Sequence, residues 1–179
     1  MKAPTDNAAP PERSKLSRLT DGLLYLAIAG LFAVLIARSG QGPKEGAKAS
    51  TFSLPLVGSA GRFALEQQRG RPVLMEVFAS WCGACESAAP MLRDVHREAM
   101  QSGVVLVGVS IDQDERDAAR MQRSWGIPYP VALDDGSVKR GYGVSLVPTF
   151  VLIDSDGTIK HVASGVPSRR TLSRWLAEL

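Results

Sequence analysis

The chain has only two cysteines, and both lie in the pentapeptide WCGAC at residues 81–85. This pentapeptide stands between a strand-like stretch and a helix-like stretch. The apolar residues 73–79 precede it and predict a buried strand. After Cys85, apolar residues recur at helical spacing, namely Ala88, Met91 or Leu92, Val95 and Ala99. The sequence therefore places Cys82 at the start of a helix.

A cysteine at the start of a helix is well placed for thiol chemistry. Unpaired backbone N–H groups and the positive end of the helix dipole stabilise a thiolate, so we expect Cys82 to have a lower pKa than free cysteine. Cys85 follows one turn later, within reach of a mixed disulfide formed on Cys82. The spacing predicts attack by an exposed Cys82 and resolution by a more shielded Cys85. Because neither Gly83 nor Ala84 ionises, we expect a reducing to intermediate couple.

Other uses of the two cysteines fit the sequence less well. A disulfide that encloses only two residues constrains the unfolded chain little, so it would be a poor structural crosslink. A zinc site needs about four ligands, and only His96 and His161 could join the cysteines. Soft thiolates also suit copper(I). A copper(I)-binding chaperone module therefore remains the alternative function.

The rest of the domain alternates strand-like and helix-like segments. A tight turn at residues 155–157 predicts a terminal hairpin, and Ser168 precedes a last helix with Leu172, Trp175, Leu176 and Leu179 on one side. This order predicts helices on both faces of a central mixed sheet. The expected strands cover residues 73–79, 104–111, 149–154 and 158–163, and the expected helices cover residues 83–100 and 114–125.

Four segments together resemble one family. The segment VLMEVFASWCGAC resembles the active-site strand and helix of thioredoxin-fold proteins, and YGVSLVPTFVLIDSDGTI resembles their cis-proline segment. Residues 104–135 are similar to the strand-and-helix insert of the membrane-anchored TlpA, ResA and DsbE (CcmG)-like branch, and TFSLPLVGSAGRFALEQQRGRP to its amino-terminal hairpin. The resemblance covers residues 51–179. It implies a thioredoxin-like α/β/α fold of three layers, preceded by a single N-terminal transmembrane helix.

The resemblance also implies roles for individual residues. Glu76 occupies the place of a buried acid that handles the proton of the second cysteine, and burial should raise its pKa. Pro148 is expected to be cis, with the backbone of Val147 presented to a bound peptide. Trp81 is expected to line the partner groove, and Pro90 to kink the helix.

Two relatives of this fold offer competing interpretations. In a peroxiredoxin a Thr or Ser is expected three residues before the cysteine, where this chain has Ala79. In a copper chaperone of the Sco type three residues separate the cysteines, and the histidine lies near the cis-proline. His161 comes beyond that position, and His96 is expected to be a surface or boundary residue.

The first 50 residues predict a membrane attachment. Residues 1–19 lack apolar periodicity and are interpreted as a disordered cytoplasmic tail. Residues 20–37 include a charge-free apolar run that we interpret as an uncleaved transmembrane anchor, with a signal peptide cleaved near residues 47–49 or a buried globular helix as alternatives. Residues 38–50 are interpreted as a flexible linker to a domain at residues 51–179.

Composition and resemblance together predict location and partners. The net charge of +3 is spread along the chain, so we expect no nucleic-acid partner. The resemblance implies a single-pass protein of the bacterial inner membrane with its catalytic domain in the periplasm. The expected partners are extracytoplasmic cysteine-containing clients, such as proteins of cytochrome c maturation or metal-site assembly, and a membrane electron donor of the thiol-reductase type. No cofactor or metal is expected.

Overall fold

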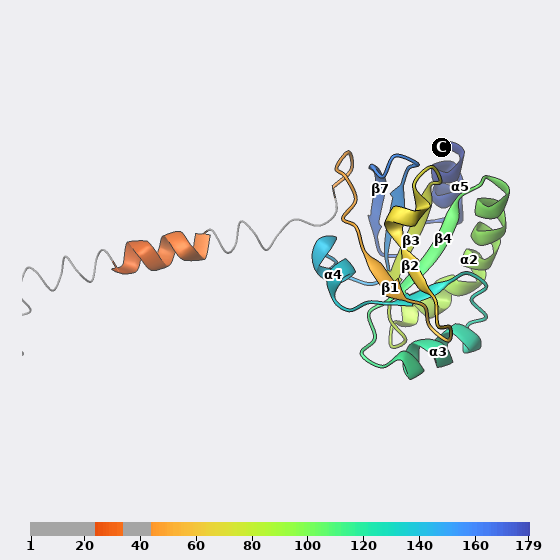
Figure 1. Cartoon of the computed structure of the whole chain (residues 1–179), viewed down its shortest axis with the longest axis horizontal. Coiled ribbons are helices and arrows are strands. Elements are labelled where there is room, and N and C mark those ends of the chain that lie inside the picture. The colour runs from red at the N-terminus through yellow and green to blue at the C-terminus, as the bar shows by residue number, and fades with distance from the viewer. Residues whose placement is uncertain (1–23, 34–43) are drawn as a thin grey trace, which may run out of the picture. The chain divides into compact units, whose positions relative to one another are not determined.

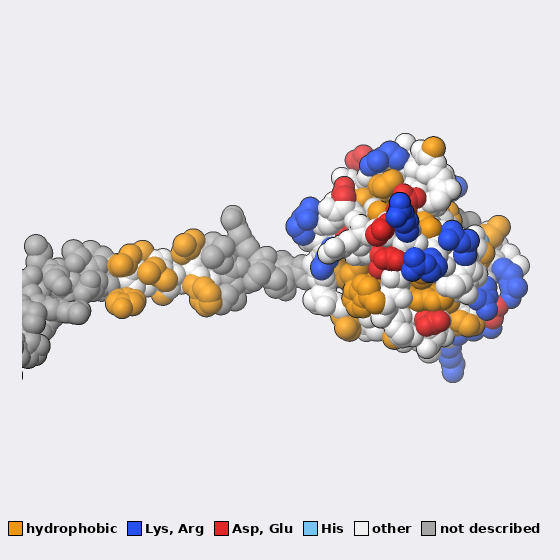
Figure 2. All heavy atoms as spheres, turned by 90° about the horizontal axis from the view of Figure 1, so that it is seen from below, with side chains coloured by type: hydrophobic (Ala, Val, Ile, Leu, Met, Phe, Trp, Pro, Cys, Tyr) orange, Lys and Arg blue, Asp and Glu red, His pale blue; other side chains and the backbone are white. Residues whose placement is uncertain are grey.

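The computed structural model describes residues 24–33 and 44–179, which belong to two separate units, residues 1–40 and 41–179. In the first unit residues 24–33 form a helix (Figure 1). Figure 2 shows hydrophobic side chains along both visible edges of this helix. Among the described residues no helix is both long and apolar enough to cross a membrane. The expected anchor at residues 20–37 is thus not shown; its two ends, and residues 1–19, lie outside the described residues.

A five-stranded mixed sheet forms the centre of the second unit (Figure 1). The strand order is β5-β4-β3-β6-β7, with β3, β4 and β5 parallel and β6 and β7 antiparallel to their neighbours. The central strand β3 is buried along its whole length, as its apolar sequence, interrupted only by Glu76, predicts. The strands are β3 (Val73–Phe78), β4 (Val105–Ser110), β5 (Val131–Leu133), β6 (Thr149–Ile153) and β7 (Ile159–Ser164).

Helices cover the sheet on both faces. Leu74 and Phe78 of β3 belong to a core shared with α2, α3 and α5, whereas Met75 and Val77 belong to a second core shared with α4 and the amino-terminal hairpin. The alternation of side chains along β3 thus feeds two cores. The helices are α2 (Gly83–Gln101), α3 (Glu115–Ser124), α4 (Ser137–Gly141) and α5 (Arg169–Ala177), with the 3-10 helix η1 (Leu65–Gln68).

The expected elements are present, and the short elements η1, β5 and α4 appear besides them. Asp114 and Ser168 cap α3 and α5 at the positions that the sequence indicates. The short elements β5 and α4 were not expected from periodicity. The sequence before α4 is rich in turn-forming residues, but the carboxylate of Asp134 accepts the N–H groups of Val138 and Lys139 and so holds this single helical turn.

The amino-terminal hairpin consists of β1 (Ser53–Pro55) and β2 (Arg62–Ala64) in a small sheet of their own. Ahead of it, part of the expected linker is paired with the domain. The Gly46 N–H donates to the Ile159 carbonyl at 2.8 Å, and the Ile159 N–H donates to the Ala47 carbonyl at 2.9 Å. The domain therefore begins several residues before position 51, and the part of the linker at residues 38–43 lies outside the described residues.

Candidate active site

The two cysteines lie where β3 gives way to α2. Cys82 is the N-cap residue of α2, with extended backbone angles, and its sulfur accepts the N–H of Cys85 at 3.1 Å. The sulfur thus occupies a position at which free N–H groups of the first helical turn converge. This confirms the expected helix start and puts Cys82 where a thiolate would be stabilised in the reduced protein.

Cys82 and Cys85 are joined by a disulfide. Cys85 is 1% exposed and Cys82 is 7% exposed. The expected order of exposure is therefore correct, but Cys82 is less open than expected for an attacking residue. It is surrounded by the loop that precedes α2 and by the segment before β6. Cys82 lines the groove described below, which gives a partner access to it.

Asp112, an acid that no sequence pattern singles out, fixes the loop before Cys82. Its carboxylate accepts the backbone N–H of Ser80 at 3.0 Å and the Ser80 hydroxyl at 2.8 Å. It also accepts the hydroxyl of Ser110, the last residue of β4, at 2.6 Å. Asp112 is 7% exposed, so these bonds form away from bulk water. The loop that carries the attacking cysteine is thus tied to the end of the neighbouring strand.

Glu76 lies in the middle of β3 and is buried. It shares its face of the strand with Leu74 and Phe78, which pack in the same core as both cysteines. Oε2 accepts a hydrogen bond from the hydroxyl of Tyr129 at 2.9 Å. Burial raises the Glu76 pKa to about 7, and the Tyr129 bond partly offsets this rise. A carboxyl group with such a pKa can both accept and return a proton near neutral pH.

The Val147–Pro148 peptide bond is cis, as expected. Next to it a groove of about 420 Å³ opens beside the disulfide. Two of its residues are strongly exposed hydrophobic side chains, Trp81 at 70% and Leu146 at 54%. The groove is lined by Trp81, Cys82, Gly83, Ala84, Ile111, Lys139, Val144, Ser145, Leu146 and Val147. The groove thus places exposed hydrophobic side chains beside Cys82.

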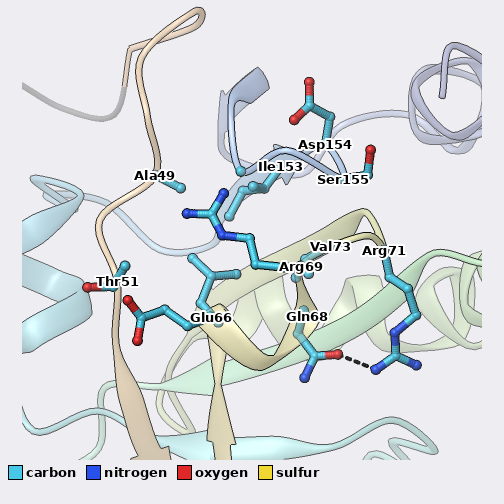
Figure 3. Close-up of a pocket in the computed structure, with 12 residues that line it drawn as sticks. Ala49, Thr51, Glu66, Gln68, Arg69, Arg71, Val73, Ile153, Asp154 and Ser155 are labelled. Atoms are coloured by element: carbon cyan, nitrogen blue, oxygen red, sulfur yellow. Dashed lines mark hydrogen bonds between the residues drawn. The ribbon is translucent and has the colours of Figure 1, made fainter.

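A second pocket lies at the other end of β3 (Figure 3). Val73, the first residue of that strand, lines it together with residues of η1 and of the β6–β7 turn. Figure 3 shows Arg69 extending between the amino-terminal segment and Ile153, and Arg71 bonded to Gln68. The lining includes neither cysteine, so this pocket is separate from the disulfide.

The two histidines are engaged elsewhere. His161 stacks on Trp175, with ring centroids 4.9 Å apart, and its Nε2 lies 2.5 Å from Glu178. His96 packs its ring against Tyr129 at 5.6 Å, and burial lowers its pKa. Within residues 24–33 and 44–179, no three His, Cys, Asp or Glu side chains are grouped so that they could hold a metal ion.

Comparison with known proteins is consistent with this geometry. Residues 44–179, which make up most of the chain, match the Redoxin family. The chain belongs to the Redoxin family. Within it, the chain has the features of the TlpA/ResA/DsbE-like branch expected from the sequence.

The relatives of this Redoxin-family chain are thiol-disulfide oxidoreductases. It is 29% identical to the thiol-disulfide oxidoreductase ResA of Bacillus subtilis over 133 residues, and this alignment covers 74% of each chain. It is 26% identical over 119 residues to ResA of Bacillus thuringiensis, covering 66% of this chain and 69% of the relative. With the disulfide at the helix start, these relationships show that the chain is an enzyme of the same type, a thiol-disulfide oxidoreductase.

Solved structures show the same thioredoxin-like fold. A Chlorobium tepidum protein described as a thiol:disulfide interchange protein DsbE superposes with a TM-score of 0.70 and 29% identity, covering 76% of this chain and 97% of the other. The MTB dsbF protein, in mixed oxidised and reduced forms, superposes with a TM-score of 0.65 and 25% identity, covering 71% and 93%.

The structure brings together most of the residues that the sequence indicated. Trp81, Cys82 and Val147 line one groove, whereas Glu76 is buried in the middle of β3 and does not line it. Asp112 and Tyr129 were missed. The only sequence signal for Asp112 is an acid directly after the expected strand at residues 104–111, and Tyr129 lies between two prolines in a segment without periodicity.

Proposed function

We propose that this enzyme is tethered to the bacterial inner membrane and, on the periplasmic side, reduces disulfides of extracytoplasmic client proteins. The observation that carries the exchange chemistry is the Cys82–Cys85 disulfide at a helix start, which opens into an apolar groove beside a cis-proline. The tether is supported by the charge-free apolar run within residues 20–37 and by the apolar surface of the helix at residues 24–33.

In the first step the reduced enzyme attacks a client disulfide. The Cys82 thiolate forms a bond to one client sulfur, the client S–S bond breaks, and the other client sulfur leaves as a thiolate. The N–H of Cys85 already points at the Cys82 sulfur, at 3.1 Å, and stabilises its negative charge before the attack. The product is a mixed disulfide between Cys82 and the client.

In the second step Cys85 releases the client. Its sulfur bonds to Cys82, the bond from Cys82 to the client breaks, and the electron pair leaves with the client sulfur. The Cys85 thiol must lose its proton for this attack. Glu76 faces the same core and, with a pKa of about 7, takes this proton as general base. Two electrons have then passed from the enzyme to the client.

The client binds as an extended segment along the cis-proline loop. The backbone of Val147 pairs with the client backbone, and the exposed side chains of Trp81 and Leu146 cover apolar residues next to the client cysteine. A reductant in an oxidising compartment must be re-reduced, so the disulfide form is returned to the dithiol by a membrane electron donor of the thiol-reductase type.

The exchange activity is tested by reduction of insulin disulfides, with Cys82→Ser as the inactive control. We expect reduction by the unchanged enzyme and no stoichiometric retention of copper(I). Retention of copper(I) through both cysteines without disulfide reduction would support the chaperone function instead.

The clients, the reducing direction and the compartment are tested by trapping. A Cys85→Ala variant retains Cys82 and lacks the resolving thiol, so it should hold clients as mixed disulfides in the membrane fraction. Loss of these adducts in Cys82→Ser is the control. Adducts with cytosolic proteins only, or a soluble enzyme, would contradict the proposal.

A further inference from the structure

A missing side chain in the core makes room for the partner of Glu76. Gly108 of β4 lies directly beside Glu76 in the register of the parallel strands β3 and β4. A Cβ atom at Gly108 would lie 2.6 Å from Cε1 of Phe78 and 3.3 Å from Cε2 of Tyr129. Both aromatic rings therefore occupy space that any other residue at position 108 would take.

This space is what lets Tyr129 reach into the core. Tyr129 is 1% exposed and lies in the segment between α3 and β5, far in sequence from Glu76. The segment is held in place from both sides, because the Gly108 N–H donates to the Pro130 carbonyl at 2.9 Å and the side-chain amide of Gln122 donates to the Tyr129 carbonyl. The hydroxyl is thus directed at Oε2 of Glu76, 2.9 Å away.

We infer that Tyr129, seated against Gly108, is a positioning residue for the resolving step, which holds the Glu76 carboxylate and sets the pH range in which it accepts the proton of Cys85. The inference rests on the proposed role of Glu76. Tyr129 acts through Glu76 and takes no direct part in the exchange. It neither gains nor loses a proton in the net step.

The direction of the effect follows from the charges. The Tyr129 hydroxyl donates to the carboxylate and so favours its ionised form, which opposes the rise in pKa that burial causes. The tyrosine does not ionise in place of the glutamic acid, because burial and the neighbouring Glu76 raise the Tyr129 pKa above its ordinary value. From α2, the charge of Arg93 acts on Tyr129 and the ring of His96 packs against it, while Cys85 belongs to the same core as Tyr129.

The proton balance of the step is simple. The proton of the Cys85 thiol passes to Glu76 as the Cys85 sulfur attacks Cys82, and Tyr129 keeps its hydrogen bond to the carboxyl group. Glu76 later returns this proton to solvent. If the hydrogen bond were lost, the carboxyl group would stay protonated to a higher pH, and a smaller fraction of it would be ionised and able to accept the proton at neutral pH.

Tyr129→Phe removes the hydroxyl and keeps the ring. The reduced enzyme is mixed in a stopped-flow instrument with one equivalent of the aromatic disulfide 5,5′-dithiobis(2-nitrobenzoate). The first release of coloured thiolate reports the attack by Cys82, and the second reports resolution by Cys85. We expect the midpoint of the pH profile of the second phase to move upward by about one pH unit.

At pH 7 this displacement predicts about fivefold slower resolution, with the two rates converging at about pH 9. The first phase should be unchanged. Tyr142→Phe is the matched control, because Tyr142 is another buried tyrosine, and its hydroxyl donates to the Ser50 carbonyl at 2.8 Å, away from Glu76. This variant should keep the midpoint of the unchanged enzyme.

A second substitution tests the opposite direction without loss of the hydroxyl. Tyr129→3-fluorotyrosine makes the hydroxyl a stronger donor at nearly the same size, so the midpoint should move to lower pH. An unchanged midpoint in both Tyr129 variants, or a slowing of resolution by the same factor at every pH, would overturn the inference.

Glu76→Gln separates this inference from the proposed function. It should abolish the pH dependence of the second phase. If it leaves that pH dependence intact, the role of Glu76 itself fails. If it abolishes the dependence while Tyr129→Phe does not move the midpoint, only the role of Tyr129 fails.

Discussion

The carboxylate of Asp112 accepts both the backbone N–H and the hydroxyl of Ser80, at 3.0 Å and 2.8 Å. Ser80 stands two residues before Cys82, so this pair fixes the turn that delivers the attacking sulfur to the start of α2. The Cys82 N–H also donates to the Ala79 carbonyl at 3.1 Å within the same turn. The buried Asp112 therefore positions the loop before Cys82, whereas the role proposed for the buried Glu76 is proton transfer.

Asp112→Ala should destabilise the domain and slow the first attack. It leaves the Ser80 N–H and the hydroxyl groups of Ser80 and Ser110 without their buried acceptor. This loss should lower the free energy of unfolding by about 1.5–3 kcal/mol. Urea denaturation of the oxidised protein measures this loss. Asp117→Ala is the control, because Asp117 is half-exposed and pairs with the exposed Arg120, so its loss should cost less than that of Asp112, about 0.5 kcal/mol. Equal losses in the two variants would contradict the role of Asp112.

Glu76 should make the folded domain less stable as pH rises. Burial raises its pKa from 4.5 to about 7, so between these values the unfolded chain has released the proton while the folded domain still holds it. The free energy of unfolding should therefore fall by about 3 kcal/mol in total from pH 4.5 to pH 7, and this contribution should be constant above that range.

Glu76→Gln should remove this decline, so the variant gains stability relative to the unchanged protein as pH rises. Urea denaturation of the oxidised protein at several pH values measures the difference. Glu66→Gln, which changes an exposed glutamate of η1, should keep the original profile. A Glu76→Gln profile that runs parallel to that of the unchanged protein would show that burial does not perturb this carboxyl group.

Trp81→Ala should weaken client binding with little effect on stability. The side chain is 70% exposed, so its removal should change the free energy of unfolding by less than about 0.5 kcal/mol. The KM for a peptide with apolar residues beside its disulfide should rise about tenfold, because an aromatic contact at the groove is lost. Attack on a small aromatic disulfide should not change. Met100→Ala, at the far end of α2, is the exposed hydrophobic control and should leave the KM unchanged.

The elements that the sequence predicts well are those whose buried residues recur with a clear local periodicity. The apolar run of β3 and the helical spacing after Cys85 fix the junction at which the disulfide lies. The strand β5 has only three residues, and α4 depends on the side chain of Asp134, so neither carries a periodic signal. Family resemblance, rather than periodicity, indicated the cis bond before Pro148.

The long-range partners of the site are the part that sequence patterns could not supply. Tyr129 and Glu76 are 53 residues apart, and Asp112 and Ser80 are 32 residues apart. Both contacts depend on the parallel register of β3 and β4, and the contact of Tyr129 also depends on the absent side chain at Gly108. Such contacts appear only once the strands are placed side by side.

In the proposed mechanism, the start of α2 makes Cys82 the acidic, attacking thiol. The most direct test is a titration of the reduced Cys85→Ser variant, followed by the ultraviolet absorbance of the thiolate, with Cys82→Ser as the reference for the other sulfur. We predict that Cys82 ionises well below the value of about 8.5 for free cysteine and that Cys85 ionises above Cys82. A Cys82 thiol that ionises at or above the value of free cysteine would contradict the account.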